Sequence, residues 1–243
     1  MSLQNRNTLK SFFKKGQLVS EKHFIDLIDS MINKVDDGMS KTLDDGLVLS
    51  PIGSSQKLIS FYKSIEDKNP AWHFQIDASD ASFNINNQVG DSIVTIKNTG
   101  KVGIVQKEPQ HELDVNGNIA SKGRVGTFHQ GKILADGKWH PVISNLNGCY
   151  AFDVMAGVGK KKTGKYALIQ AFAMSTFGKS NNKIRVNQAY YGTYCNKIEL
   201  RWRGETYNYQ LEMRTRCSYG GEYYVKYNIT NLWLDQFMDD SLD

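Results

Sequence analysis

Short apolar runs alternate with turn residues from residue 43 to residue 234, and this pattern limits the possible folds more than any other feature of the chain. In residues 207–213, apolar side chains stand at every second position, with Asn208, Gln210 and Glu212 between them. A period of two places successive side chains on opposite faces of a β-strand. Strands with one apolar face are typical of antiparallel sheets that pack one side on a core. We therefore predict a mainly β protein.

Residues 1–42 are the one region with helical spacing, and we predict a short helical docking module there. Gly16 suits the end of a first helix, and Ser20 is a good N-cap for a second. Apolar residues of the second helix recur at helical spacing: Phe24, Leu27, Ile28, Met31 and Val35. A short helical hairpin cannot bury such a face alone. We expect it to pack on another domain, another subunit or a copy of itself, and not on a membrane, because nearby aspartates would be repelled by anionic lipid.

The remaining chain divides into two β-rich parts that differ in how much core they can build. In residues 43–121, polar residues such as Asn84, Asn86 and Asn87 lie between thin apolar rows. One chain would have difficulty covering such rows, which favours a fibre-like β linker or shaft built from intertwined subunits. Residues 122–243 hold about seven or eight strand patterns, the number expected for a C-terminal β-sandwich or jelly-roll-like head domain.

Charge is spread unevenly along the chain. Residues 122–234 hold 17 Lys and Arg against 6 Asp and Glu, and the last nine residues hold four Asp and no base. A basic domain can attract nucleic acid or an acidic glycan. The bases are dispersed among the strand patterns, so we expect a solvated surface that balances an acidic neighbour, and no nucleic-acid partner.

Two further patterns bear on location. No stretch approaches the roughly 20 apolar residues that cross a bilayer, so we expect no membrane insertion. Residues 1–15 lack the apolar core of a secretory signal. We expect synthesis in the cytoplasm and assembly into a particle that leaves the cell by lysis or through a dedicated machine.

Cysteine and histidine spacing indicates neither a metal nor a cofactor. Cys149, Cys195 and Cys217 are widely spaced and form no Cys-x-x-Cys pair. We expect them to be small buried hydrophobes in a reducing compartment, with one disulfide after release as the alternative. The five histidines are scattered without the paired spacing of a local metal site: His23, His73, His111, His129 and His140.

No catalytic motif is present in the sequence, and we predict that the protein is not an enzyme. A Gly-x-Ser-x-Gly elbow is absent, and residues 160–164 (KKKTG) fit a solvated hairpin loop better than a phosphate loop. Glu199 and Glu212 alternate with apolar residues, so we expect them to be surface partners of Arg201 and Arg214. A pair of carboxylates for glycoside cleavage is the alternative.

Aromatic residues near turns of the C-terminal part are candidates for glycan contact. Sugar sites commonly combine an aromatic platform with planar polar groups. The candidates are five tyrosines: Tyr190, Tyr191, Tyr194, Tyr219 and Tyr223. The alternative is that these tyrosines belong to a core or a subunit interface, with their hydroxyls reaching solvent.

Three local patterns resemble proteins of one class. Residues 7–16 (NTLKSFFKKG) and 20–30 (SEKHFIDLIDS) resemble a short N-terminal module of proteins encoded with bacterial contractile injection systems and phage-like tails. Residues 100–105 (GKVGIV) and 113–119 (LDVNGNI) resemble a linking repeat of phage tail fibres and trimeric adhesins. That repeat usually has Gly-Thr where this chain has Val105 and Gln106. The segment from ADGKWHP (135–141) to NLWL (231–234) resembles a C-terminal β-domain of the same class.

The resemblance implies a structural component of a phage-tail-like contractile injection particle, usually a trimer. Its helices would dock to tail, cap or baseplate components, and its C-terminal domain would serve assembly or target contact. The alternative is a carbohydrate-binding adhesin or tail-fibre head that acts on cell-surface glycans. Leu113 and Val115 point to one side and could meet their copies on a threefold axis, or they could belong to a plain hairpin of a monomer.

Overall fold

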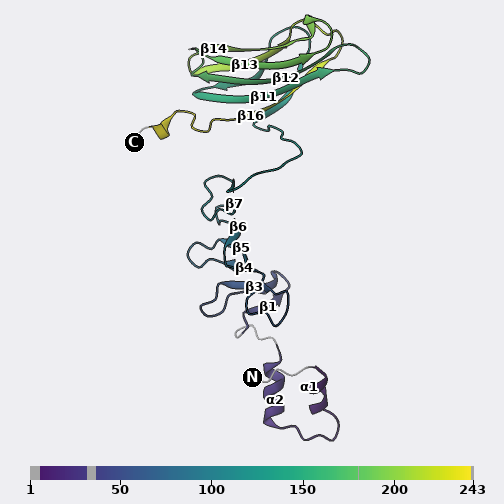
Figure 1. Cartoon of the computed structure of the whole chain (residues 1–243), viewed down its shortest axis with the longest axis vertical. Helices are drawn as coiled ribbons and strands as arrows, with labels where there is room; N and C mark the ends of the chain where they lie inside the picture. The colour runs from purple at the N-terminus through teal and green to yellow at the C-terminus, as the bar shows by residue number, and fades with distance from the viewer. Residues whose placement is uncertain (1–5, 32–36, 180, 242–243) are drawn as a thin grey trace. The chain divides into compact units, whose positions relative to one another are not determined.

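The computed structural model describes residues 6–31, 37–179 and 181–241 (Figure 1). It is mainly β, with 44% strand and 9% helix, a short N-terminal helical region and several sheets, which confirms the predicted fold class. The chain separates into two compact units, Met1–Ala120 (unit 1) and Ser121–Asp243 (unit 2). The division into residues 1–42, 43–121 and 122–243 stays a prediction. Among the described residues, no helix has the length and apolar character to cross a membrane.

Two short helices begin unit 1, α1 (Arg6–Phe12) and α2 (Glu21–Asp29). Ser20 is the N-cap of α2, as predicted, and its backbone N–H donates to Nδ1 of His23 at 3.3 Å. The His23 ring in turn stacks on Phe12, with 4.2 Å between ring centroids, and so links the two helices. The predicted apolar face of α2 is exposed at Phe24 and Ile28. Val35, the last residue of that predicted face, lies outside the described residues.

The rest of unit 1 is two antiparallel strands and a six-stranded sheet. The small pair is β1 (Met39–Thr42) with β2 (Gly46–Leu49). The larger sheet has its strands in chain order: β3 (Lys57–Phe61), β4 (Trp72–Ile76), β5 (Phe83–Asn87), β6 (Ser92–Ile96), β7 (Val102–Ile104) and β8 (Leu113–Val115). Neighbours are antiparallel except β7 and β8, which are parallel. The β8 segment therefore does not form a plain hairpin with the strand before it.

Unit 1 buries polar side chains and leaves apolar ones accessible. In its described part, no Val, Ile, Leu, Met, Phe, Tyr or Trp side chain is buried. Its buried polar and charged residues are Asp26, His73, Ser82, Asn84, Asn86, Ser92 and Thr95. One face of the six-stranded sheet is apolar and the other is polar, because the strands alternate. Folding of this unit alone therefore leaves much of its apolar surface in contact with water.

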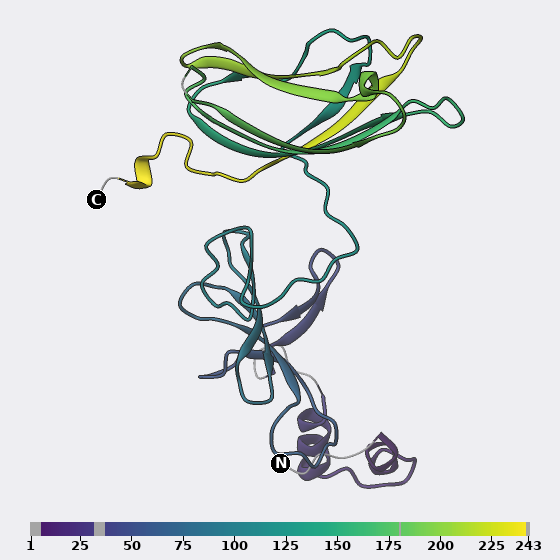
Figure 2. The ribbon, with the colours of Figure 1, turned by 45° about the horizontal axis from the view of Figure 1, so that its top comes forward.

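Unit 2 consists of two antiparallel sheets that share one core (Figure 2). The larger sheet has the order β13 (Lys183–Tyr190), β12 (Tyr166–Thr176), β11 (Cys149–Gly159), β16 (Tyr224–Asn231) and β9 (His129–Leu134). The smaller has the order β10 (His140–Leu146), β15 (Asn208–Thr215) and β14 (Ile198–Glu205). Phe152 of β11 and Trp202 of β14 meet between the sheets, with ring centroids 6.1 Å apart. Fully buried Ile169, Leu211 and Ile229 complete this contact, so unit 2 has the core that unit 1 lacks.

Candidate functional site

The predicted tyrosines converge in part at one end of unit 2, beside the 3-10 helix η1 (Tyr194–Asn196). Tyr190 ends β13, Tyr191 follows it, and Tyr194 begins η1. All three rings are exposed, and Tyr191 most of all at 65%. Edge-to-face contacts organise the group, with centroids 6.3 Å apart for Tyr190 and Tyr194 and 6.4 Å apart for Tyr191 and Tyr166.

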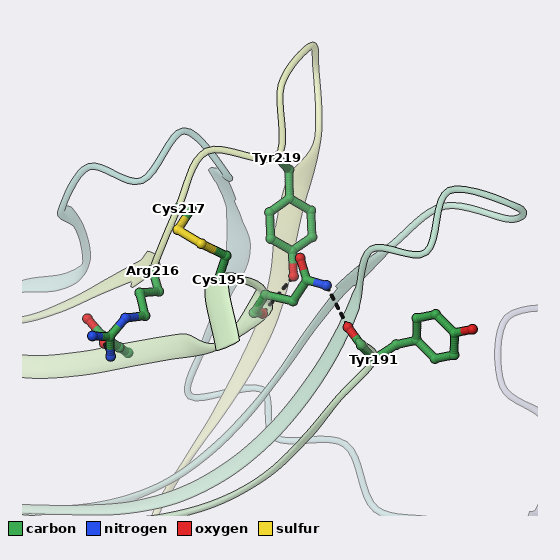
Figure 3. The surroundings of a disulfide bond; sticks show 7 residues. Tyr191, Cys195, Arg216, Cys217 and Tyr219 are labelled. Carbon is green, nitrogen blue, oxygen red and sulfur yellow. Dashed lines mark hydrogen bonds and ion pairs between the residues drawn. A yellow bond between two sulfur atoms is a disulfide. The ribbon is translucent and has the colours of Figure 1, made fainter. Parts of the chain in front are cut away.

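A disulfide joins η1 to the segment that follows β15 (Figure 3). Cys195 and Cys217 have their Cα atoms 5.0 Å apart, and the Cys217 N–H donates to the Cys195 carbonyl at 3.1 Å. The expectation of three reduced cysteines is therefore wrong for this pair. It holds for Cys149, which is free and buried. The pairing follows from the neighbouring ends of β14 and β15, which bring residues 22 positions apart together.

Asn196 holds the loop around η1 in place. Its side chain is buried and donates from Nδ2 to the carbonyls of Tyr191 at 2.6 Å and Gly164 at 3.2 Å. Its own carbonyl accepts the hydroxyl of Tyr219 at 2.7 Å. Three separate segments are thus hydrogen-bonded to one residue, which fixes the loop that carries Tyr191 and Tyr194.

Tyr219 does not belong to the surface, which corrects part of the predicted set. Its side chain is only 2% exposed, and burial raises the pKa of its hydroxyl to about 12. Tyr223 packs partly against the core, with its ring centroid 5.9 Å from that of Tyr219. The sequence could not distinguish these tyrosines because all of them border turns. Glycan contact by the exposed ones stays a prediction.

Two cations missed by the sequence reasoning complete the surface. Lys197 Nζ lies 4.1 Å from the ring centroid of Tyr194 and 5.1 Å from that of Tyr190. Arg216 Cζ lies 4.1 Å from the Tyr194 centroid. Cations at these distances are attracted by the ring faces. We call Tyr190, Tyr191, Tyr194, Lys197 and Arg216 the η1 surface. Chemically, it combines exposed aromatic rings with positive charge.

The predicted pairing of the β14 and β15 carboxylates with arginines is confirmed, but Glu212 is buried and is not the surface residue that was expected. Arg201 Nε donates to Glu212 at 2.6 Å, and Arg214 lies 2.7 Å from Glu199. The indole of Trp139 lies near both guanidinium groups, at 4.2 Å from Arg201 Cζ and 4.4 Å from Arg214 Cζ. Each carboxylate is thus occupied by an arginine on the opposite strand, an arrangement suited to sheet stability rather than proton transfer.

One other predicted feature can be placed. The loop of residues 160–164 is the turn between β11 and β12, and its lysines are exposed, as expected for a solvated hairpin loop. Within the described ranges, no group of three His, Cys, Asp or Glu side chains could hold a metal ion.

Comparisons with known proteins give little further guidance. No protein-family profile matches the sequence, and no curated protein matches it. Among solved structures, the chain is similar to the tailspike protein of Acinetobacter phage vB_ApiP_P1, with a TM-score of 0.30 and 10% sequence identity. The match covers 48% of this chain and 24% of the tailspike chain, so it spans about a quarter of that protein's length. A likeness at this level does not establish a common fold or activity.

Proposed function

We propose that this chain is a non-enzymatic structural component of a phage-tail-like contractile injection particle, and that it assembles through unit 1 with copies of itself. The observation that carries the proposal is the apolar face of the six-stranded sheet. Strand pairing places these side chains on one face: Ile59, Phe61, Trp72, Phe74, Ile76, Phe83, Ile85, Val94, Ile96, Val102, Ile104, Leu113 and Val115. Each is partly or largely accessible.

The composition of this apolar face supports a second copy as its partner. No charged residue lies among the paired positions of the face, so nothing repels an identical face. An aromatic row crosses it, with ring centroids 5.2 Å apart for Phe61 and Phe74 and 5.6 Å for Phe74 and Phe83. Burying one large apolar side chain stabilises a complex by roughly 1.5–3 kcal/mol. Since unit 1 buries no such side chain itself, association would supply its missing core.

The apolar face includes Leu113 and Val115, the two apolar strand residues of the segment that resembles a tail-fibre repeat. Leu113 pairs with Val102, and Val115 pairs with Ile104, so both side chains share the face with β7. Leu113 is among the more exposed residues there. This placement supports the proposed contact between copies on a threefold axis, and the trimer is the state we propose.

Measurement of mass in solution tests the proposal. Native mass spectrometry of the full chain should show three times the chain mass of 27.5 kDa. Phe61→Glu should shift the protein toward monomer, because it places a charge in the proposed interface. Ile65→Glu is the matched control, since Ile65 is exposed in the turn between β3 and β4 and is not among the paired positions of the face. A wild-type chain that is monomeric at micromolar concentration would refute self-assembly.

The helices supply the proposed contact with other particle components. Phe24, Ile28 and Met31 expose an apolar stripe on or just beyond α2. Deleting residues 1–31 should leave the trimer intact and prevent incorporation into particles assembled from co-expressed tube, sheath and baseplate proteins. Normal incorporation of the shortened chain would contradict this role. A cytoplasmic origin and release with the particle belong to the same proposal.

The η1 surface supports a second candidate function, contact with a cell-surface glycan. Its exposed Tyr191 ring could stack on a sugar, and Lys197 could pair with an acidic group. Arg216 already pairs with Glu199 at 3.3 Å. A glycan array with the full chain tests this idea. Binding should be lost in Tyr191→Ala and retained in Tyr207→Ala, a control at another exposed tyrosine. Absence of binding to any acidic polysaccharide would remove the candidate.

A further inference from the structure

The polar face of the unit 1 sheet carries a groove of about 480 Å³. Strand pairing sets His73 of β4 opposite Asn86 of β5, and Gln75 opposite Asn84. Thr95 of β6 lies opposite Asn84 on the next strand. The polar side chains of three strands therefore line one concave surface. It lies opposite the apolar face and is separate from the η1 surface of unit 2.

Hydrogen bonds hold most of these side chains in fixed positions. Asn86 Nδ2 donates to Gln75 Oε1 at 3.1 Å, and Gln75 Nε2 donates to Gln56 Oε1 at 2.8 Å. On the neighbouring strands, Ser92 Oγ bonds to Asn84 Oδ1 at 3.1 Å. These two groups of hydrogen bonds organise donors and acceptors before any ligand arrives.

Two buried atoms of the groove have no hydrogen-bond partner. They are Nδ1 of His73 and Oδ1 of Asn86, whose side chains are 4% and 5% exposed. Buried polar atoms are almost always paired, because an unpaired one loses its bonds to water without replacement. Both atoms line the groove and belong to paired residues on adjacent strands. Two unsatisfied hydrogen-bonding atoms therefore lie just beneath the surface of the groove, in side chains that line it.

The charges around the groove balance. Its lining holds Lys57, Lys97 and Lys107 against Asp77, Asp80 and Glu108, three of each sign. Lys97 Nζ lies 2.8 Å from Asp80 Oδ2 and 2.7 Å from Glu108 Oε1, so its charge is balanced by these two carboxylates. Burial and the nearby Lys57 lower the pKa of His73, which keeps the ring neutral near pH 7. A net charge of zero favours neither an anion nor a cation.

We propose that this groove binds an uncharged, hydroxyl-rich ligand, namely a neutral saccharide. Both atoms are buried, so a ligand reaches them only when the lining side chains shift. Hydroxyl groups can then donate to Asn86 Oδ1 and can donate to or accept from His73 Nδ1, whichever tautomer is present. The volume falls within the roughly 300–1,000 Å³ of small-molecule sites. Its lining is polar rather than apolar, which matches a polyol and not a hydrophobic compound. The inference does not depend on the proposed particle or on the η1 surface.

Ligand-observed NMR with the full-length chain tests the groove. The probes are methyl glucoside, methyl galactoside, methyl mannoside and maltotriose, with glucuronate and inorganic phosphate as charged comparisons. We expect at least one neutral saccharide to bind and neither charged probe to displace it. Asn86→Leu and His73→Phe should each weaken binding at least tenfold. Asn118→Leu is the matched control, because Asn118 is exposed outside the groove.

Stability distinguishes a binding role from a structural one. Both groove variants remove an unsatisfied polar atom, but Asn86→Leu also removes the bond from Asn86 Nδ2 to Gln75 Oε1. The melting temperature of each variant is therefore measured beside its affinity, so that a loss of folded protein is distinguished from a loss of binding. Failure of every neutral saccharide to bind would overturn the proposal, and the two atoms would then hold ordered water only. Preference for a charged probe would overturn it as well, as would unchanged affinity in a groove variant that folds. If neither variant folds, the wild-type selectivity between neutral and charged probes decides.

Discussion

Arg124 donates from Nη2 to Oδ2 of Asp153 at 2.6 Å and so joins the segment that enters unit 2 to the middle of its larger sheet. The Asp153 side chain is 3% exposed, whereas that of Arg124 is 68% exposed. Gln170 on β12 donates to the other carboxylate oxygen at 3.4 Å. A charge buried on the outer face of a sheet therefore depends on one arginine that reaches it from solvent.

Arg124→Ala should destabilise unit 2. The substitution leaves the Asp153 carboxylate buried with only the long Gln170 contact. We expect a loss of about 1–3 kcal/mol in unfolding free energy, less than for a fully buried pair because Arg124 is open to solvent. Urea denaturation measures the change. Lys179→Ala is the control: it removes an exposed pair with Glu205 and should have no measurable effect. Wild-type stability of Arg124→Ala would contradict the role assigned to the pair.

Gly126→Ala tests the packing of the same entry segment, because an added methyl group would overlap neighbouring atoms. A Cβ at this glycine would lie 2.6 Å from the carbonyl carbon of Ile229 and would also meet Thr230 Oγ1. The segment is held there by the Phe128 N–H, which donates to the Ile229 carbonyl at 3.0 Å. We expect a loss of about 1–3 kcal/mol, typical of overpacking, measured by thermal and urea unfolding.

Gly123→Ala is the matched control for this prediction, because no heavy atom lies within 4 Å of its Cβ position. Equal effects of the two substitutions would show that the tight packing at Gly126 is not responsible. A stable Gly126→Ala protein would show that the entry segment does not lie against β16.

Period-two alternation explains what could be predicted from the sequence. It identified the β class, and it indicated that Glu199 and Glu212 pair with arginines, although Glu212 is buried rather than exposed. Because β14 and β15 are antiparallel neighbours, those two positions face Arg214 and Arg201 across the ladder. Strand alternation was therefore sufficient to predict those contacts that depend only on a residue's own strand and the adjacent strand.

Properties that depend on distant segments could not be predicted. Tyr219 and Tyr191 both border turns, yet one hydroxyl is buried against the Asn196 carbonyl and the other ring is exposed. The polar residues at alternate positions of β4 and β5 would ordinarily face solvent. Instead, His73 and Asn86 are buried there, so the groove was not foreseen. Pairing of Cys195 with Cys217 likewise follows from sheet register rather than from spacing.

Thiol counting tests the disulfide. Without reductant, the native chain should expose no reactive thiol, since Cys149 is buried and burial raises the pKa of its thiol. Denaturation should release one thiol, and reduction should then release the other two. Reduction should lower the unfolding free energy by about 3 kcal/mol, as expected for a cross-link that closes a loop of this size. Three thiols in the denatured, unreduced chain would contradict the pairing.

Alkaline pH should destabilise unit 2 through its buried tyrosines. Burial raises the pKa values of Tyr209 and Tyr219 to about 12, whereas an unfolded tyrosine ionises near pH 10. Below pH 10 both states keep the proton, so this contribution to stability is complete. It is lost as pH rises from about 10 to 12, because only the unfolded state releases its protons there. The loss should reach roughly 2 kcal/mol for each tyrosine by pH 12.

Urea midpoints at pH 8, 10 and 11 measure this loss, and two Tyr→Phe variants separate it from the deprotonation of lysines. Tyr219→Phe should be less stable at pH 8 by about 1 kcal/mol, because the bond to the Asn196 carbonyl is gone. It should also lose less stability between pH 10 and 11, since one buried hydroxyl no longer resists ionisation. Tyr207→Phe, at an exposed position, should follow the wild type at every pH. Identical pH dependence of the two variants would mean that the Tyr219 hydroxyl is not protected by the fold.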